Sequence, residues 1–478
     1  MDPLSADRPS AAAWGSRLGL SAVPVAVVAL PTAAVAAAHR EWAVLAGLGV
    51  PVAAGALGGC LAWACRPGER DRATPSRAQA LGLVWLLATA VAAAPFLAAA
   101  HLGDAPSAST AALGSPLNAA FEAMSGLTTS GLSVAGTPEE LPASLLWWRS
   151  SLSWLGGLGL LYLALSIGVL DGRKRTGDDD QDAGDELGSG EDGQDGPGLR
   201  GVLWWTWAAY LGLTLAACAA YRLAGMSLWD AANHAQSAVS TGGFSTRAAS
   251  LDAFGPPAQA VTLLFVLLGA ISFAPIRAAV FGRDPRGLFR DAQARWLVVG
   301  VAVGGPLLWL ASGLDAWTAC FQWAMALTTG GFGLVKTQDL PALTLCLLVP
   351  AALVGAGAGS TGGGLKLGRL RRLLRWAAGR GTAEDELDET RLQTLKVAAA
   401  FCVSFLLGTL GVWLAAGRPP WAAAAFEAAS ALGNGGLSAG ITGPDAPAAA
   451  RGVLMTLMWL GRLEFVLLFE LVLKKRRR

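Results

Sequence analysis

The sequence predicts an all-α polytopic membrane protein with four tandem helix, pore loop, helix repeats around a pseudo-fourfold pore, preceded by an N-terminal two-helix hairpin. Three observations predict this class. Of the 478 residues, 53% are hydrophobic and only 15% are charged. Apolar runs of about twenty residues, the length that crosses a bilayer core as a helix, recur along the chain. A short glycine-containing motif occurs four times, each time at the end of a short apolar segment.

The repeated motif supplies the candidate ion-binding residues. Its four copies are Thr128-Thr129-Ser130-Gly131, Ser240-Thr241-Gly242-Gly243, Thr328-Thr329-Gly330-Gly331 and Gly433-Asn434-Gly435-Gly436. Only the final glycine is the same in all four copies. Glycine reaches backbone conformations that a Cβ makes costly, so it can turn neighbouring carbonyl groups towards a shared axis. A ring of carbonyls can replace the hydration water of a monovalent cation, and the C-terminal dipole of each preceding short helix would point at the same site.

Each repeat is expected to contain one helix, a pore segment and a second helix. The predicted domains are a tail and hairpin at 1–72, repeat 1 at 73–175, an acidic flexible cytoplasmic linker at 176–198, and repeats 2 to 4 at 199–290, 291–385 and 386–478. Spans are expected at 18–38 and 42–64, at 79–100 and 143–170, at 201–223 and 257–281, at 296–313 and from about 341, and at 394–415 and 450–473. The first pore segment is expected at about 117–132.

Two of these regions have alternative interpretations. The run at 18–38 could be a cleaved signal peptide, but it is longer than the hydrophobic region of such a peptide. The linker at 176–198 is rich in aspartate, glutamate and glycine, and cannot bury enough apolar surface to order itself. A solvated linker is the favoured interpretation, and docking to a basic partner is the alternative.

Basic clusters predict the orientation in the membrane. In the predicted topology they all lie on the side of the membrane that has no pore loop. They comprise Arg66 to Arg77, Arg173 to Arg175, Arg283 to Arg295, Lys366 to Arg380 and Lys474 to Arg478. By the positive-inside rule this side is cytoplasmic. We therefore expect both termini inside, an even number of spans, and four pore loops that enter from outside.

The six cysteines form no CxxC pair and only three histidines are present, so no resident metal is expected.

A glycine-rich run interrupts the second helix of repeat 3. Its residues include Gly355, Gly357, Gly359, Ser360, Thr361, Gly362, Gly363 and Gly364, and Lys366 follows. Each glycine would cost a helix about 1 kcal/mol, so an unwound loop is expected. Such backbone survives at membrane depth only where protein buries it or where it lines water. A phosphate cradle is the alternative, but no strand precedes the run and the GxxxxGK[ST] spacing is absent. A gate beneath the filter is the favoured interpretation.

Arg462 is expected near the middle of the last helix, where a charge costs about 2.5 to 3.5 kcal/mol on insertion scales. Such a residue usually faces a partner or a water-filled cavity. Glu464 is two residues away and would face another side of the helix. An ion pair with a distant acid is one interpretation. The favoured one places Arg462 in the ion path, where it either bonds the carbonyls of the 355–364 loop or forms an electrostatic barrier.

Together these residues resemble the Trk/Ktr/HKT superfamily of potassium transporters over nearly the whole chain from about residue 18. The resemblance rests on the four filter motifs, the run Gly359 to Lys366, the segment Trp154-Leu155-Gly156-Gly157-Leu158-Gly159, and Gly461-Arg462-Leu463-Glu464. The N-terminal hairpin makes the chain more similar to the TrkH/TrkG branch than to the shorter KtrB branch. First filters with glycine, as at Gly131, favour potassium over sodium in this superfamily. Ser130 and Leu132 depart from the threonine and alanine common in TrkH-like first filters.

The resemblance also implies partners and a location. It implies potassium uptake across a bacterial inner membrane, potassium as substrate with no bound cofactor, a homodimer, and a separate cytoplasmic TrkA-like subunit that binds the regulatory nucleotide. No nucleic-acid partner is expected. A sodium-permeable or cation-coupled transporter of the same fold stays open at this stage. An intramembrane lipid-modifying enzyme is the alternative from another class, but scarce histidine and few buried acids argue against it.

Overall fold

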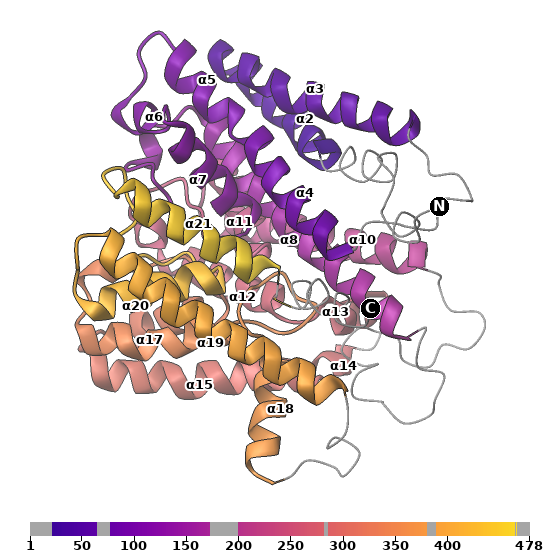
Figure 1. Cartoon of the computed structure of the whole chain (residues 1–478), viewed down its shortest axis with the longest axis vertical. Helices are drawn as coiled ribbons and strands as arrows, with labels where there is room; N and C mark the ends of the chain where they lie inside the picture. Colours follow the sequence, from indigo (N-terminus) through magenta and orange to yellow (C-terminus); the bar gives the residue numbers. More distant parts are fainter. Residues whose placement is uncertain are drawn as a thin grey trace, which may run out of the picture.

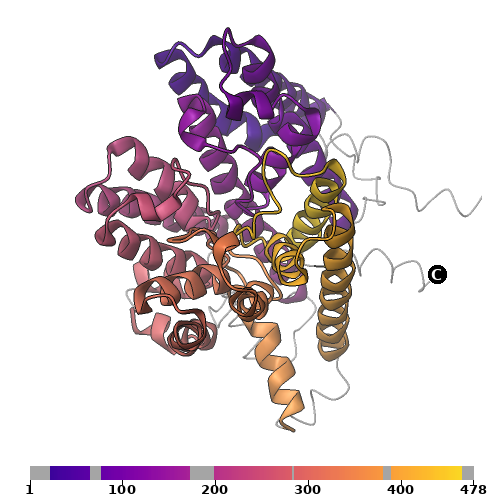
Figure 2. The same ribbon diagram turned by 90° about the vertical axis from the view of Figure 1, so that its left-hand side faces the viewer.

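The computed structural model describes residues 22–64, 77–172, 199–281, 285–379, 389–463 and 465. These residues form α-helices and short 3₁₀ turns, and they contain no strand. The predicted linker at 176–198 and the basic C-terminus at 474–478 lie outside the described residues, as does Glu464. In Figure 2 several helices are seen nearly end-on, and the purple, pink, orange and yellow parts of the chain surround a common centre.

The N-terminal hairpin forms one edge of the molecule (Figure 1). It consists of α2 (Ala22–Ala38) and α3 (Trp42–Ala64), which agrees with the spans expected at 18–38 and 42–64. Gly55 permits the close contact between them, because a Cβ added there would lie 2.3 Å from the Cβ of Ala26. Small residues let membrane helices approach closely in this way.

Repeat 1 has the predicted order of a helix, a pore segment and a second helix. The first helix is divided at Ala93 into α4 (Arg77–Ala92) and α5 (Ala94–Leu102), and α6 (Ala108–Ala112) follows. The pore helix α7 (Pro116–Leu127) leads into the first motif, after which η1 (Pro138–Glu140) and the returning helix α8 (Ala143–Gly172) complete the repeat.

Repeat 2 corrects one expectation. It contains α10 (Leu199–Leu223), the pore helix α11 (Leu228–Val239), η2 (Ser250–Ala253), α12 (Pro256–Ala270) and α13 (Phe273–Phe281). The expectation of a single helix at 257–281 is wrong, because the chain bends by 106° between α12 and α13.

The break between α12 and α13 has a physical cause in the glycine-rich run of repeat 3. The backbone N–H of Phe273 donates to the carbonyl of Gly359 at 3.0 Å, and the carbonyl of Ala270 accepts from Gly357 N–H at 2.9 Å. Backbone groups that a continuous helix would pair internally are therefore paired with the loop. Pro275, which has no N–H, is tolerated in the first turn of α13.

Repeat 3 contains the expected unwound segment. Its elements are α14 (Pro285–Arg290), α15 (Ala292–Ser312), the pore helix α16 (Ala316–Leu327), η3 (Thr337–Asp339), α17 (Ala342–Val354) and α18 (Leu367–Ala377). Residues 355–366 between α17 and α18 are not helical, as the glycine content predicts. In both ribbon views α18 projects away from the bundle (Figures 1 and 2).

Repeat 4 contains α19 (Glu389–Ala415), the pore helix α20 (Trp421–Gly433) and α21 (Ala448–Arg462). The expected position of Arg462 in mid-helix is wrong, because α21 ends at this residue. Leu463 is the C-cap of the helix, and Phe465 has a left-handed φ of 55°, which is not helical. A helix end leaves its last carbonyls without intrahelical partners, so that other segments can pair with them.

Four of the described helices are each long and apolar enough to cross a bilayer, and a fifth crossing results if α12 and α13 count as one broken span. The four are Trp42–Ala64, Gly82–Leu102, Ala292–Ser312 and Arg391–Ala415. Helices α2 and α17 are apolar but shorter, with 17 and 13 residues. Length and hydropathy alone therefore select only part of the ten spans that the sequence predicts.

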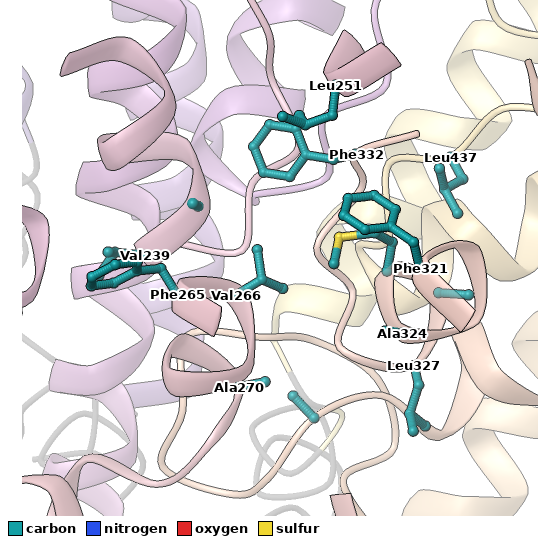
Figure 3. Close-up of a cluster of buried hydrophobic side chains, with 14 of the residues drawn as sticks. Val239, Leu251, Phe265, Val266, Ala270, Phe321, Ala324, Leu327, Phe332 and Leu437 are labelled. Atoms are coloured by element: carbon teal, nitrogen blue, oxygen red, sulfur yellow. The ribbon is translucent and has the colours of Figure 1, made fainter. Parts of the chain in front are cut away.

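Buried apolar side chains hold the pore helices of neighbouring repeats together. Figure 3 shows one such cluster between α11, α12, α16 and the segments that follow the third and fourth motifs. The side chains labelled there are Val239, Leu251, Phe265, Val266, Ala270, Phe321, Ala324, Leu327, Phe332 and Leu437. Phe321 and Phe332, which flank the third motif, are fully buried.

Glycines let the second helices reach the ends of the pore helices. A Cβ added to Gly461 would lie 2.0 Å from the carbonyl oxygen of Leu432, and one added to Gly156 would lie 2.2 Å from that of Leu127. The equivalent distance from Gly269 to the carbonyl of Val239 is 2.6 Å. These neighbours are backbone atoms, so side-chain rotation cannot relieve the overlap.

Gly461→Ala is therefore expected to lower the melting temperature of the purified protein in detergent, because the pore helix α20 must move. Gly452→Ala in the same helix is the matched control, since a Cβ there meets nothing within 4 Å. Alanine at that position gains about 1 kcal/mol of helix propensity, so its melting temperature should stay equal or rise. Equal losses in the two variants would contradict the packing described here.

Candidate functional site

Each pore helix ends in a loop with the same unusual backbone. The second residue of every motif is left-handed, with φ of 55° at Thr129, 52° at Thr241, 56° at Thr329 and 56° at Asn434. The final glycine is left-handed as well, with φ of 73° at Gly131, 71° at Gly243, 73° at Gly331 and 74° at Gly436. A β-branched residue with positive φ is strained, and such strain persists only where the surroundings impose it. The four loops therefore repeat one conformation, which is strained at the three threonines and tolerated at Asn434.

The four glycines lie next to one another in a closed order. A Cβ added to Gly131 would lie 2.4 Å from the carbonyl oxygen of Gly242, and one on Gly243 would lie 2.8 Å from the Cα of Gly331. A Cβ on Gly331 would lie 3.1 Å from the carbonyl oxygen of Gly435, and one on Gly436 would lie 2.3 Å from that of Ser130. Repeat 1 thus contacts repeat 2, repeat 2 contacts repeat 3, repeat 3 contacts repeat 4, and repeat 4 contacts repeat 1.

Burial distinguishes these glycines from the rest of the motifs. Gly131, Gly243, Gly331 and Gly436 are each partly exposed. All other motif residues are buried, namely Thr128, Thr129, Ser130, Ser240, Thr241, Gly242, Thr328, Thr329, Gly330, Gly433, Asn434 and Gly435. The accessible surface of the ring is therefore glycine backbone rather than side chain.

Side-chain hydrogen bonds tie the buried motif residues to the protein. The hydroxyl of Thr128 donates to the carbonyl of Met124 at 2.7 Å. Asn434 bridges two repeats, because its Nδ2 donates to the hydroxyl of Ser130 at 2.9 Å and to the carbonyl of Met458 at 3.0 Å. Ser130, where the sequence departs from the superfamily pattern, thus accepts a bond from the fourth motif.

The loop at 355–366 contacts the ends of three pore segments. Gly363 N–H donates to the hydroxyl of Thr329 at 2.9 Å. The hydroxyl of Thr361 lies 3.0 Å from the carbonyl of Val239 and 2.9 Å from that of Gly269. A Cβ on Gly363 would lie 2.2 Å from the carbonyl oxygen of Gly433, so the fourth pore helix touches the loop as well.

Internal bonds hold the loop in shape. Gly355, Gly359 and Gly364 have φ of 71°, 69° and 84°. Lys366 is also left-handed, with φ of 80°, and it is 1% exposed. Its ammonium group donates to the carbonyl of Gly362, and the hydroxyl of Ser360 donates to the carbonyl of Gly357 at 2.6 Å. The gate residues predicted between Gly355 and Lys366 thus form one hydrogen-bonded segment that is buried except at Gly359, which is half-buried.

Arg462 joins this segment to repeat 1. Its guanidinium lies 2.6 Å from the carbonyl oxygen of Gly156, 3.0 Å from the hydroxyl of Thr129 and 3.3 Å from the carbonyl oxygen of Thr361. The side chain is 1% exposed. These partners are neutral oxygens, and one of them belongs to the 355–364 loop, as one of the two favoured interpretations expects. Arg462 and the loop together contact the pore segments of all four repeats.

One set of equivalent residues was not interpreted from the sequence. Glu122, His234, Gln322 and Glu427 each stand nine residues before the glycine of their motif, and each is 0% exposed. A polar residue at the same place in four otherwise apolar segments was the signal. We call these four the anchor residues.

The described residues contain no group of histidine, cysteine, aspartate and glutamate suited to a metal ion. The cysteines at 60, 218, 320, 346 and 402 are free thiols, and Cys65 lies outside the described residues.

Comparison with known proteins identifies the family. A family model described as "TrkH: Cation transport protein" matches residues 52–311 and 294–472. The chain belongs to the TrkH family. It is thus a multi-pass membrane protein of a transporter family, and the alternative of an intramembrane enzyme is excluded.

Relatives of this TrkH family chain include two curated proteins named "Trk system potassium uptake protein TrkH". The one from Halomonas elongata is 34% identical over 270 residues, which are 55% of this chain and 55% of that protein. The one from Vibrio parahaemolyticus is 30% identical and the match covers 82% of this chain and 83% of that protein. The crystal structure of the potassium transporter TrkH from Vibrio parahaemolyticus superposes with a TM-score of 0.78 at 26% identity, covering 96% of this chain and 98% of that one.

The bond between the loop and the third motif gives a prediction for this TrkH family chain. Thr329→Val removes the acceptor of Gly363 N–H inside the protein, which should cost about 1–3 kcal/mol and lower the melting temperature in detergent. Thr329→Ser keeps the hydroxyl and is the matched control, so it should stay close to wild type. If valine and serine at this position behave alike, the hydroxyl does not hold the loop.

Proposed function

We propose that this chain takes up potassium across a bacterial inner membrane through a selectivity filter formed by its four motifs. The observation that carries the proposal is the closed order of four partly exposed, left-handed glycines, one from each repeat. The relatives named as potassium uptake proteins support potassium as the substrate. The membrane potential would drive entry, and no resident cofactor is required.

The filter would act through backbone groups. Carbonyl oxygens of the motif residues would replace water around the ion as it passes the glycine ring. The C-terminal ends of α7, α11, α16 and α20 precede the ring, so their dipoles would favour a cation there without a charged ligand. Gly131 in the first motif favours potassium, whereas Ser130 and Leu132 are the residues that could weaken discrimination against sodium.

The gate would be the loop at 355–364 with Lys366 and Arg462. The last residue of α11 and residues of the third and fourth motifs contact the loop directly, so a change in the shape of the loop would alter the filter. Arg462 adds a positive charge at the junction of Thr129 and Thr361, which would oppose cation passage. Release of the bonds from Arg462 to Thr129 and Thr361 would therefore open the ion path.

Orientation and partners follow from the same proposal. The basic clusters favour cytoplasmic termini and pore loops that enter from outside. Family resemblance favours a homodimer and a cytoplasmic TrkA-like regulatory subunit that carries the nucleotide site. The acidic segment at 176–198 would then lie on the side where such a subunit docks.

Growth of a potassium-uptake-deficient bacterium on low potassium tests the function. Expression of this chain should restore growth and produce rubidium influx that potassium inhibits more strongly than sodium. The control is a strain that expresses Gly331→Asp, which places a charged side chain in the glycine ring. Absence of influx from correctly inserted wild-type protein would contradict the proposal, and stronger inhibition by sodium would favour a sodium-permeable transporter.

Substitution of Arg462 tests the gate. Arg462→Gln keeps a hydrogen-bond donor but removes the charge, so rubidium influx should rise severalfold relative to wild type. Arg451→Gln is the control, because Arg451 lies in the first turn of the same helix and is half-buried. Unchanged influx in Arg462→Gln at normal expression would exclude a barrier at this residue.

A further inference from the structure

The anchor residues, Glu122, His234, Gln322 and Glu427, share a contact that links each pore helix to the far side of its own filter motif. Each bonds a residue eleven or twelve positions later, just beyond the motif glycine. In repeat 4, Ser438 hydroxyl donates to the carboxylate of Glu427 at 2.8 Å and Ala439 N–H donates at 2.7 Å. A single residue, Leu437, separates Ser438 from the ring glycine Gly436.

The same bonds recur in the other repeats with different chemistry. In repeat 1, Ser133 hydroxyl and Val134 N–H donate to Glu122 at 2.9 and 3.0 Å. In repeat 3, Leu334 N–H donates to Gln322 Oε1 at 3.4 Å, while Gln322 Nε2 donates to the hydroxyl of Thr337 at 3.2 Å.

In repeat 2, Nε2 of His234 lies 2.9 Å from the hydroxyl of Ser245, and Nδ1 lies 2.8 Å from the carbonyl of Asp230. A neutral imidazole fits both contacts, because Nδ1–H can donate to the carbonyl while Nε2 accepts from the hydroxyl. Every repeat therefore places an acceptor against the segment that leaves the filter.

The buried carboxylates of Glu122 and Glu427 have different kinds of partner. Glu122 pairs with Arg149 at 2.7 Å, with both side chains buried. The same guanidinium donates to Ser133 at 3.1 Å and lies 4.2 Å from the ring of Phe244, the residue after the second ring glycine. The described partners of Glu427 are instead hydroxyl and amide donors of Ser438, Ala439 and Thr442.

We propose that the anchor residues are positioning residues for ion selectivity, because they hold the outer end of each filter wall at the distance that suits potassium. This inference rests on the proposed function. The inner end of each wall is fixed by the pore helix and the outer end by its anchor, so the ring glycines are held from both sides. A carbonyl ring held at a fixed spacing can discriminate by size, because an ion that does not fill the ring gains less from the same carbonyls.

Substitutions at Gln322 give the sharpest test. Gln322→Leu fills a similar volume but leaves Leu334 N–H without an acceptor, so the ratio of rubidium to sodium affinity should fall roughly tenfold, as for one lost buried hydrogen bond. Gln322→Glu keeps that acceptor and can accept from the hydroxyl of Thr337, so it should retain the ratio. The measurement is the KM for rubidium and the inhibition constant for sodium in proteoliposomes, with maximal influx recorded separately.

Glu427→Gln provides a second variant, because its NH2 group would replace one of the two carboxylate oxygens and oppose the donor of Ala439 or those of Thr442, so it should also lower the ratio. Glu139→Gln is the matched control, since Glu139 is an exposed carboxylate that accepts from Ala248 N–H outside the ring. If a variant carries no influx, melting temperatures in potassium and in sodium replace the flux measurement. Wild-type protein should be stabilised more by potassium, and Gln322→Leu and Glu427→Gln should lose this difference.

The outcomes separate the two proposals. Wild-type protein without rubidium influx would contradict the proposed function. Wild-type influx with an unchanged affinity ratio in Gln322→Leu and Glu427→Gln would overturn the anchor proposal alone. An equal loss in Gln322→Glu, or in the Glu139→Gln control, would also overturn it.

Discussion

Contact between four glycine backbones, one from each repeat, is the constraint on which the rest of the structure depends. At each of these positions an added Cβ would meet the backbone of the next repeat rather than a side chain that could rotate away. The contact therefore fixes the ends of all four pore helices. The second helices of repeats 1, 2 and 4 pack against these pore-helix ends. Gly156, Gly269 and Gly461 let them approach the last carbonyls of the pore helices.

Repeat 3 departs from this pattern on one side of the ring. There α17 ends at Val354 and a non-helical segment replaces the continuous helix. Irregular backbone at this depth requires partners for its polar groups, and the break between α12 and α13 supplies two of them at Ala270 and Phe273. The break in repeat 2 and the loop in repeat 3 are thus one arrangement, and the fourfold symmetry is lost where the gate is proposed.

Much of the fold could be predicted because it depends on local pattern. The motifs recur at recognisable positions, and the excess of glycine after Val354 indicates unwinding without any knowledge of the neighbours. The break at Ile271 and Ser272 could not be predicted in this way, since its cause is a pair of hydrogen bonds to a loop about ninety residues away. Likewise, the apolar sequence around Arg462 suggests a continuous helix, whereas the helix ends where the guanidinium reaches Gly156 and Thr361.

The candidate site was predictable to a similar extent. Glycine identity pointed to the four ring positions, but the strained second position was hidden because threonine and asparagine occupy it in place of glycine. The anchor residues Glu122, His234, Gln322 and Glu427 stand at one sequence position, nine residues before each ring glycine. Their chemical differences concealed their common role, which becomes clear only when the segment beyond each glycine folds back onto its pore helix.

Anomalous diffraction from crystals grown in rubidium locates the bound ion without reference to any mutant. A rubidium peak is expected on the axis between Gly131, Gly243, Gly331 and Gly436, within coordination distance of carbonyl oxygens from all four loops. A map in which the ring is occupied by no ion while rubidium binds elsewhere, or in which the four loops stand apart, would contradict this expectation.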